Sequence, residues 1–252
     1  MEVYWLEQTE ADVPAENDWL GESEAVHMAG LRFPKRRADW RLGRWTAKRA
    51  LAGYLNFPSH PQALAAIEIR PAPDGAPEVF FANQPATVTI SLSHRAGRAA
   101  CAIAQPGAAL GCDLEIIEQR SEAFMADYFT TEEQALARRA PPADQSWLLT
   151  LLWSAKESGL KALRTGLRLD TRCVVVNPVD ALRHPDEDGE GCTERPALTV
   201  RPYSLNTWRA LHVQHTNGPA FHGWWQETGN LLRTLVAAPR PGKPILLKGA
   251  GL

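Results

Sequence analysis

Three carboxylates and one lysine are the residues of this chain whose types and spacing could do chemistry. Asp113 and Glu115 lie in the stretch LGCDLEII, and Glu157 and Lys161 lie in the stretch WSAKESGLKAL. Carboxylate oxygens are hard ligands that suit Mg²⁺, which usually keeps several waters and binds through carboxylates together with substrate phosphates. A strongly basic segment, residues 31–51, could bind an anion. The combination predicts phosphate chemistry.

The spacing of these residues is compatible with a site and also with an ordinary surface. Asp113 and Glu115 are two apart, so on a strand both carboxylates project from the same face, about 7 Å apart along the chain. Glu157 and Lys161 are four apart, so on a helix they lie on one face, about 6 Å per step. Taken alone, the first pair describes a solvated strand face, and the second a surface ion pair worth about 0.2–0.5 kcal/mol.

Two helices and a strand must position these groups. LGCDLEII is predicted to be a half-buried strand whose alternate apolar residues face a core. A long apolar helix is predicted from about residue 146 to residue 164, after a break at Pro141-Pro142. The basic segment that follows Pro34 is predicted to be a second helix, because its apolar residues recur with a rough 3.6-residue period.

The remaining chain predicts further strands and a further helix. Pro73-Asp74-Gly75 is a turn between two β-prone runs, and residues 87–117 predict three short strands, of which LGCDLEII is the last. Thr130 and Glu133 form the capping-box pattern of a helix start. EVYWL opens the chain as a strand, and CVVVNP, ALTVRPYSL and WRALHVQH are predicted strands near its end. This order predicts α+β layers.

The composition excludes several classes of function. The chain has 252 residues, is 44% hydrophobic and 22% charged, and has a formal net charge of -2, as in an ordinary globular protein. The near-neutral balance argues against broad binding to nucleic acid. The four cysteines have no zinc-site spacing, so we expect reduced thiols. Because a signal peptide and an apolar run of about 18 residues are both lacking, we expect a cytoplasmic protein that does not contact a membrane.

Two motifs resemble those of a known family. GCDLE at residues 111–115 and WSAKESGLKAL at residues 153–163 are similar, in this order, to motifs of the 4′-phosphopantetheinyl transferases of the surfactin-synthetase-activating type. Weaker companions are SLSHRAG (residues 91–97), DGAP (residues 74–77) and GRWTAKRAL (residues 43–51). Such enzymes move the phosphopantetheine arm of coenzyme A onto a serine of an acyl or peptidyl carrier protein and release adenosine 3′,5′-bisphosphate.

The resemblance implies roles for the four residues. Asp113, Glu115 and Glu157 would hold Mg²⁺, or Mn²⁺ in its place, against the pyrophosphate of coenzyme A. Glu157 would take the proton from the serine hydroxyl, directly or through a metal-bound water. Lys161 would donate a proton to the departing bisphosphate or stabilise it electrostatically. Groups in these roles contribute about 10²–10⁴ in rate.

The resemblance also implies contacts with the phosphates of coenzyme A. Ser93 and His94 match positions that reach the 3′-phosphate, and Arg44 and Lys48 match the basic helix that assists them. Lys156 matches a family lysine that contacts a coenzyme A phosphate. Without the family, His94 is more simply interpreted as a buried or capping histidine.

The adenine site departs from the family pattern. Gly75 and Pro77 match a turn that lines the adenine, but Ala76 replaces the basic residue often found between them. We therefore expect Arg36 or Arg37 to supply the missing phosphate contact.

The family fold is α+β and consists of two pseudo-twofold-related α/β halves, each a small antiparallel sheet packed by a helix. We accordingly expect an N-terminal half, residues 1–110, that contacts coenzyme A, and a C-terminal half, residues 111–237, that carries Mg²⁺ and the catalytic residues. Residues 238–252, rich in Pro and Gly, are expected to be a flexible tail. The family type also implies a monomer.

Carrier proteins are commonly acidic, so we expect a basic and apolar docking surface near the cleft. The candidate is the segment FMADYFTTEEQALARR, residues 124–139. Its expected contacts are Phe124, Met125, Tyr128 and Phe129.

Two other functions fit the same residues. One is a catalytically silent module of this fold that binds coenzyme A or a carrier protein, although binding alone has no evident need for the full set of acids. The other is a different Mg²⁺-dependent phosphotransferase or nuclease. The absence of GxxxxGK[ST] excludes P-loop nucleotide binding, and the near-neutral charge disfavours a nuclease.

Overall fold

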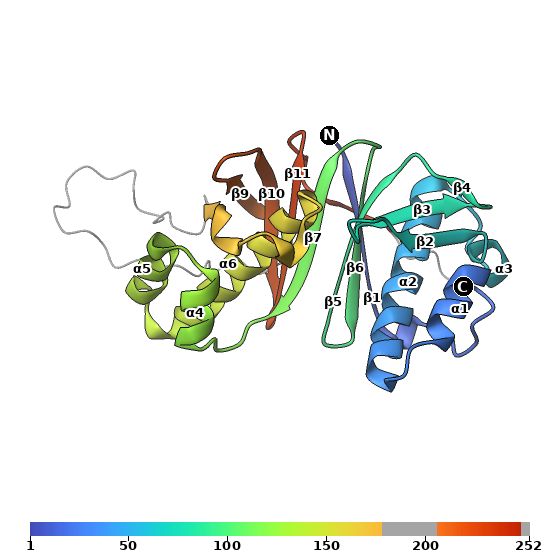
Figure 1. Ribbon diagram of the computed structural model, residues 1–252, viewed down its shortest axis with the longest axis horizontal. Coiled ribbons are helices and arrows are strands. Elements are labelled where there is room, and N and C mark those ends of the chain that lie inside the picture. The colour runs from blue at the N-terminus through green and yellow to red at the C-terminus, as the bar shows by residue number, and fades with distance from the viewer. Residues whose placement is uncertain (178–205, 248–252) are drawn as a thin grey trace.

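The computed structural model describes residues 1–177 and 206–247, and its elements form two halves, each built on its own sheet and long helix (Figure 1). The strand expected at residues 197–205 lies outside the described residues. The mixed α+β class is confirmed, because sheets with mainly antiparallel pairing alternate with helices along the chain.

The first half is built on a four-stranded sheet in the order β12-β1-β6-β5. Its strands are β1 (Val3–Thr9), β5 (Thr89–Arg95), β6 (Arg98–Ala104) and β12 (Ile245–Leu246). Helix α2 (Pro34–Leu55), predicted from its apolar period, has Pro at its first turn and buries Leu42, Trp45 and Leu51. Trp45 and Leu51 form a core with the inner face of the sheet.

A hairpin and short helices complete the first half. Strands β2 (Ile67–Pro71), β3 (Pro77–Phe81) and β4 (Gln84–Pro85) form a small antiparallel sheet. The predicted turn joins β2 to β3, and Gly75 adopts a φ of +87°, which glycine tolerates without a steric cost. The other elements are α1 (Glu22–Ala29), α3 (Pro61–Leu64) and a 3₁₀ turn at Glu10–Asp12.

The second half is built on a five-stranded antiparallel sheet in the order β7-β11-β10-β9-β8. Its strands are β7 (Ala109–Ile116), β8 (Val174–Asn177), β9 (Arg209–His215), β10 (Ala220–Thr228) and β11 (Leu231–Ala238). The helices are α4 (Glu122–Tyr128), α5 (Thr131–Arg139) and the long α6 (Pro142–Ala162), with 3₁₀ turns at Gly166–Arg168 and Thr171–Cys173. The predicted long helix thus begins at the second proline of the Pro141-Pro142 pair, which suits the first turn of a helix.

The two long helices carry the same buried arrangement. Lys48 of α2 and Lys156 of α6 both follow a Trp-x-Ala sequence and are fully buried. Lys48 pairs with Glu24, which caps α1, and Lys156 pairs with Glu133, which caps α5, at 2.8 Å. Each glutamate also accepts a hydrogen bond from a strand amide, Glu24 in β2 and Glu133 in β8. This correspondence is what a pseudo-twofold relation of the halves predicts.

A third apolar core joins the two sheets. Trp5 and Ala102 of the first sheet pack with Leu110, Cys112 and Leu235 of the second. Strands β5 and β7, from different halves, run beside each other in the middle of the molecule (Figure 1).

The chain end is also attached to the first sheet. Of the segment expected to be a flexible tail, residues 245–246 pair in parallel with β1, and the Leu247 amide donates to the Trp5 carbonyl. Residues 248–252 lie outside the described residues. In residues 1–177 and 206–247, helices long and apolar enough to cross a membrane are absent.

Candidate active site

Strand β7 and helix α6 come close enough to bring Asp113 and Lys161 into contact. Gly111 allows this approach, because a Cβ at its position would lie 1.8 Å from the Ser158 carbonyl oxygen of α6. The helix backbone therefore packs directly on the strand, and only glycine fits at the crossing. Two residues further along β7, the Asp113 side chain meets the same helix.

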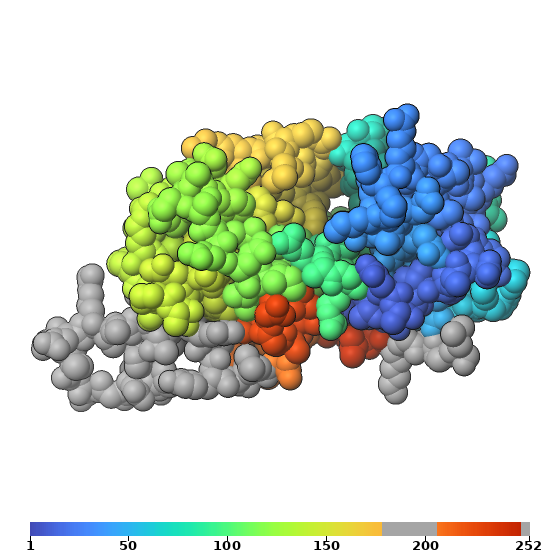
Figure 2. Space-filling model, turned by 90° about the horizontal axis from the view of Figure 1, so that it is seen from below, coloured from blue at the N-terminus to red at the C-terminus, as the bar shows by residue number. Residues whose placement is uncertain are grey.

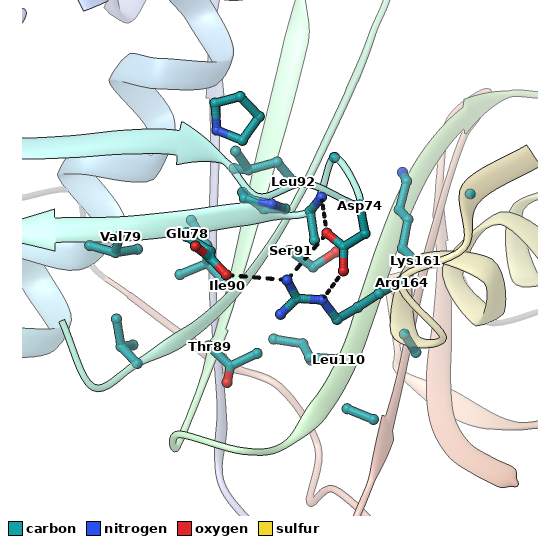
Figure 3. Close-up of a pocket in the computed structure, with 18 of the residues that line it drawn as sticks. Asp74, Glu78, Val79, Thr89, Ile90, Ser91, Leu92, Leu110, Lys161 and Arg164 are labelled. Atoms are coloured by element: carbon teal, nitrogen blue, oxygen red, sulfur yellow. Dashed lines mark hydrogen bonds and ion pairs between the residues drawn. The ribbon is translucent and has the colours of Figure 1, made fainter. Parts of the chain in front are cut away.

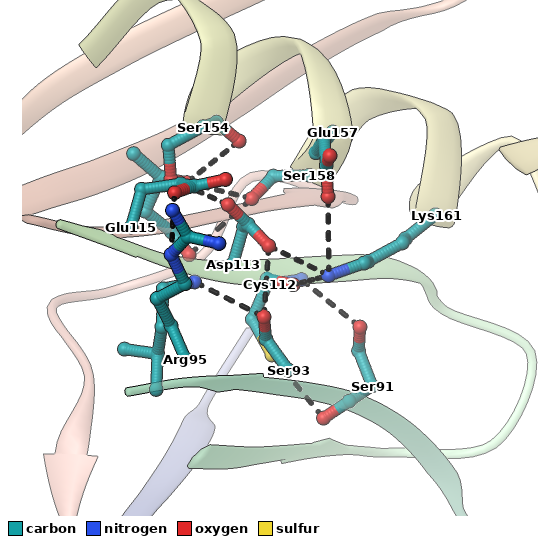
Figure 4. Close-up of polar contacts among 12 residues, drawn as sticks. Ser91, Ser93, Arg95, Cys112, Asp113, Glu115, Ser154, Glu157, Ser158 and Lys161 are labelled. Atoms are coloured by element: carbon teal, nitrogen blue, oxygen red, sulfur yellow. Dashed lines mark hydrogen bonds and ion pairs between the residues drawn. The ribbon is translucent and has the colours of Figure 1, made fainter. Parts of the chain in front are cut away.

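Asp113 is the centre of a hydrogen-bond network that includes both halves (Figure 4). Its Oδ1 accepts from Ser93 Oγ of β5 and from Lys161 Nζ, both at 2.8 Å. Its Oδ2 accepts from Ser154 Oγ of α6 at 2.9 Å. The Lys161 ammonium group also donates to the Cys112 carbonyl at 2.9 Å. Asp113 is thus buried and fixed in orientation by three side chains.

Glu157 faces the same spot from one turn earlier on α6. Its Oε2 lies 3.9 Å from Lys161 Nζ, and 24% of its side chain is exposed. Burial, together with the negative charges of Asp113 and Glu115, raises the pKa of Glu157 to about 7, although Lys161 acts against this shift. Burial acts to lower the pKa of Lys161, but Asp113 and Glu157 outweigh it and the pKa is raised. Lys161 is therefore a cation at neutral pH, and Glu157 is poised to gain or lose a proton.

Glu115 is held by a different set of partners. Its Oε1 accepts from Trp153 Nε1 at 3.1 Å, and its Oε2 pairs with Arg120 at 3.2 Å and Arg95 at 3.3 Å. Both arginines also pair with Glu118. The expected alignment of Asp113 and Glu115 on one strand face is present, but Glu115 lies among arginines rather than beside Lys161.

A divalent cation suits two of the three carboxylates. Groups of three or more metal-ligating side chains placed for one ion are absent from the described part of the chain. Asp113 and Glu157, however, crowd negative charge into a desolvated space, as the raised pKa of Glu157 indicates, and a cation would relieve it. Since Mg²⁺ often binds through one or two carboxylates plus substrate phosphates, Asp113 and Glu157, which face the cavity beside Lys161, fit this ion, whereas Glu115 is paired with two arginines.

A cavity of about 440 Å³ opens in front of these groups between the two halves. From the second half it is lined by Asp113, Glu115, Glu157 and Lys161, and from the first half by Trp40, Arg44, Ser93, His94 and Arg95. The space-filling view shows the molecule hollowed between the yellow end of α6 and the blue residues of α2 (Figure 2). The structure therefore brings the predicted acids, Lys161, Arg44, Ser93 and His94 together.

A larger cavity of about 920 Å³ adjoins the first (Figure 3). Gly75 and Pro77, the residues expected at the adenine, line it, as do Arg164 and Arg168 from the segment that follows α6. Arg44, Leu92 and Lys161 line both cavities. The two hollows are thus neighbours, and a long ligand could extend from one into the other.

Residues 109–214 match the family model of the 4′-phosphopantetheinyl transferase superfamily. The match covers less than half of the chain, and it includes Asp113, Glu115, Glu157 and Lys161. It supports a transferase of the 4′-phosphopantetheinyl transferase superfamily, the family whose motifs the sequence resembles. No curated protein sequence matches the chain.

Two lysines expected at a coenzyme A phosphate are not brought to the cavity between the halves. Lys48 donates to the Trp19 and Leu64 carbonyls besides pairing with Glu24, and Lys156 donates to the Thr171 and Val174 carbonyls besides pairing with Glu133. Both ammonium groups are fully buried. Lys48 and Lys156 thus lie within the segments that resemble the family, but here both contact groups in the protein interior.

The segment expected to dock a carrier protein, residues 124–139, is also partly internal. Met125 and Phe129 are buried, whereas Phe124 and Tyr128 are partly buried and pack edge-on against Trp153. Arg36 and Arg37, expected to compensate for Ala76, are exposed near the start of α2, outside the lining of both cavities.

Four polar residues of the site were not predicted from the sequence. Ser154 and Arg95 contact the carboxylates, Arg120 neutralises Glu115, and Arg164 lines the larger cavity. Arg95 directly follows His94 in the SLSHRAG motif, and Ser154 directly follows Trp153 in the WSAKESGLKAL motif, so each had a signal in the sequence. Arg120 and Arg164 are brought to the site only by the packing of the segments that follow β7 and α6.

Proposed function

We propose that this protein transfers the 4′-phosphopantetheine group of coenzyme A to a serine of an acyl or peptidyl carrier protein, in an Mg²⁺-dependent reaction. The products are the holo carrier protein and adenosine 3′,5′-bisphosphate. One phosphoanhydride P–O bond of coenzyme A breaks, and one P–O bond forms to the serine oxygen, whose proton is released.

The observation that carries this proposal is the meeting of Asp113, Glu157 and Lys161 with Arg44 and Ser93 in one cavity between the halves. The Glu157 carboxylate, the Lys161 ammonium group and the Arg44 guanidinium group face the same space. Such an arrangement suits transfer of a phosphoryl group, in which charge builds on the leaving phosphate while the attacking hydroxyl loses a proton.

Glu157 and Lys161 divide the proton work in this mechanism. Glu157 accepts the serine proton, since its carboxylate lines the cavity one turn before Lys161. Lys161, held at 2.8 Å from Asp113, presents a fixed positive charge to the departing bisphosphate and can donate a proton to it. Asp113 orients Lys161, and Ser93 and Ser154 orient Asp113.

Asp113 and Glu157 would hold the metal together with the coenzyme A pyrophosphate, and Glu115 would support the site through Arg95 and Arg120. When bound, Mg²⁺ supplies Lewis-acid stabilisation of the phosphate charge. Arg44 and His94 line the cavity where they can meet the 3′-phosphate, and Gly75 and Pro77 line the place proposed for the adenine.

The direct test incubates the protein with coenzyme A, Mg²⁺ and an apo carrier protein, and detects phosphopantetheine on the carrier serine by mass spectrometry. We expect the adduct to form with Mg²⁺ and to be absent in EDTA. If several carriers from fatty-acid, polyketide and nonribosomal-peptide synthesis remained unmodified, the proposed function would be wrong.

Two variants test the assigned roles. Glu157→Gln and Lys161→Ala should each slow transfer by about 10²–10⁴, the usual contribution of a positioned acid or base. Arg172→Ala is a matched control, because Arg172 forms an exposed ion pair with Asp170 on the second half. Circular dichroism checks that the variants fold. If Glu157→Gln and Lys161→Ala both transferred at the wild-type rate, helix α6 would have a structural role only.

A further inference from the structure

The residue that follows the end of α6 and its cap has an unusual backbone. Arg164 adopts a φ of +58°, in the left-handed region, at a place after the helix end where glycine is the usual residue. Side chains with a Cβ are disfavoured there, and such outliers persist only when surrounding contacts hold them. The Arg164 side chain supplies those contacts.

Arg164 connects the two halves across the larger cavity (Figure 3). Its Nε lies 2.7 Å from Asp74 Oδ2, and its Nη2 lies 3.2 Å from Asp74 Oδ1 and 3.3 Å from Glu78 Oε1. Arg168, one turn later, donates to the Asp74 backbone carbonyl at 2.6 Å. Two arginines of the second half therefore bind one turn of the first half.

That turn is the β2–β3 connection, which forms a wall of the cavity. Asp74 caps it from within, because its Oδ1 accepts from the Ala76 amide at 3.0 Å. The Arg164 guanidinium holds the pKa of Asp74 at about 2, so the carboxylate stays charged at neutral pH. Ala76 at the tip has no side chain long enough to reach the other half, so the attachment comes from Arg164 and Arg168 instead.

We propose that Arg164 is a positioning residue for coenzyme A: it holds the turn at residues 72–77 against the end of α6, so that the cavity wall is in place before the nucleotide binds. The inference rests on the proposed function, since it takes coenzyme A as the occupant of this cavity. It accounts for an arginine at a position where glycine would be less strained, because only a long, forked donor spans the gap to Asp74.

The expected effect on affinity is moderate. The Arg164 side chain is 50% exposed and that of Asp74 is 36% exposed, so water and salt weaken their attraction. If the turn occupies its binding position only part of the time without Arg164, the apparent Kd rises in inverse proportion to that fraction. We expect a rise of about three- to fivefold in the Kd of coenzyme A.

The decisive variant is Arg164→Gly, measured by calorimetric titration of the full chain with coenzyme A and by thermal unfolding. Glycine relieves the left-handed backbone, so the melting temperature should stay equal or rise while the Kd of coenzyme A increases. A merely structural role would move stability and affinity in the same direction. Loss of stability together with loss of affinity would therefore contradict the positioning role.

A second variant and a control complete the experiment. Asp74→Asn keeps an oxygen that can accept from the Ala76 amide but removes the charge that pairs with Arg164, so it should raise the Kd by a similar factor. Arg172→Ala removes an ion pair of comparable exposure that lies within one half, and should leave the Kd unchanged. In transfer assays, Arg164→Gly should raise the KM for coenzyme A and leave the KM for the carrier unchanged.

The failures of the two proposals are distinguishable. If the wild-type protein bound coenzyme A and the Arg164→Gly and Asp74→Asn variants bound it with the same Kd, only the positioning role would be overturned. Failure of the wild-type protein to bind coenzyme A would overturn the proposed function and this inference with it.

Discussion

At the scale of single residues, the charge state of Glu157 connects its proposed catalytic role with the stability of the fold. Its pKa in the folded protein is about 7, raised chiefly by burial, against an ordinary value of 4.5. Between these two values the folded protein binds more protons at this site than the unfolded chain does. The free energy of unfolding therefore falls as the pH rises from about 4.5 to about 7, because the unfolded state ionises first.

Glu157→Gln should remove this loss of folding stability at higher pH. We expect the variant to unfold at about the same temperature as wild type at pH 4.5, and to be more stable at pH 8 by on the order of 1–3 kcal/mol. Thermal unfolding in EDTA at the two pH values measures this difference, and EDTA excludes stabilisation by bound metal. A variant less stable than wild type at pH 8 would show that Glu157 is held by favourable contacts rather than strained by burial.

Residue-level prediction from the sequence succeeded where the spacing itself set the geometry. A spacing of four residues on a helix brought the charged groups of Glu157 and Lys161 within 3.9 Å of each other. A spacing of two residues on a strand placed Asp113 and Glu115 on one face. It did not distinguish lysines at the cleft from lysines in the core. Lys156 directly precedes Glu157 in the motif, yet their directions differ by about 100° around the helix, which is the difference between core and cavity.

At the scale of elements, the capping glutamates and the buried lysines tie the short helices to the long ones. Glu133 caps α5, accepts from the Val176 amide of β8 and pairs with Lys156 of α6. One carboxylate thus connects three elements in the interior. Burial acts to lower the pKa of Lys156, and the charge of Glu133 acts to restore it.

Glu133→Gln should destabilise the second half by about 3–5 kcal/mol, because the cap can be kept but the buried Lys156 charge loses its partner. The double variant Glu133→Gln/Lys156→Met should recover much of this loss. Urea unfolding measures both free energies. Calorimetric titration of the double variant with coenzyme A should give the wild-type Kd, and a large increase would instead place Lys156 in the binding site.

The elements themselves were largely predictable, because local signals specify them. The apolar period of α2, the capping box of α5, the proline before α6 and the turn at Asp74 each predicted the observed element. The strand at residues 245–246 was not predicted, since its backbone hydrogen bonds are made to β1 at the opposite end of the chain.

At the scale of the whole molecule, the halves are joined by a shared core. Trp5 and Ala102 of the first sheet are buried against Cys112 and Leu235 of the second. An ion pair between Glu7 of β1 and Arg233 of β11 lies at the same junction. Separation of the halves would expose this apolar surface to water, which costs free energy in proportion to its area.

We therefore expect the full chain to unfold in one cooperative transition. Hydrogen–deuterium exchange mass spectrometry at increasing urea should show α2 and α6 losing protection at the same concentration, as a two-state unit does. With coenzyme A and Mg²⁺ present, both helices should lose protection at the same, higher urea concentration, since a ligand bound between the halves stabilises both. Two separate transitions would mean that the halves fold as independent domains.

The sequence by itself determined the chemistry available to this protein and most of its local structure. Carboxylate, lysine and arginine types, their spacing within one strand or helix, and the turn and capping residues act over a few positions, so they can be interpreted without a fold. The tertiary structure alone decided which groups meet. Ser93 reaches Asp113 and Asp74 reaches Arg164 because β5 packs beside β7 and the β2–β3 turn faces the end of α6. These contacts depend on long-range packing, which the local pattern of residues does not encode.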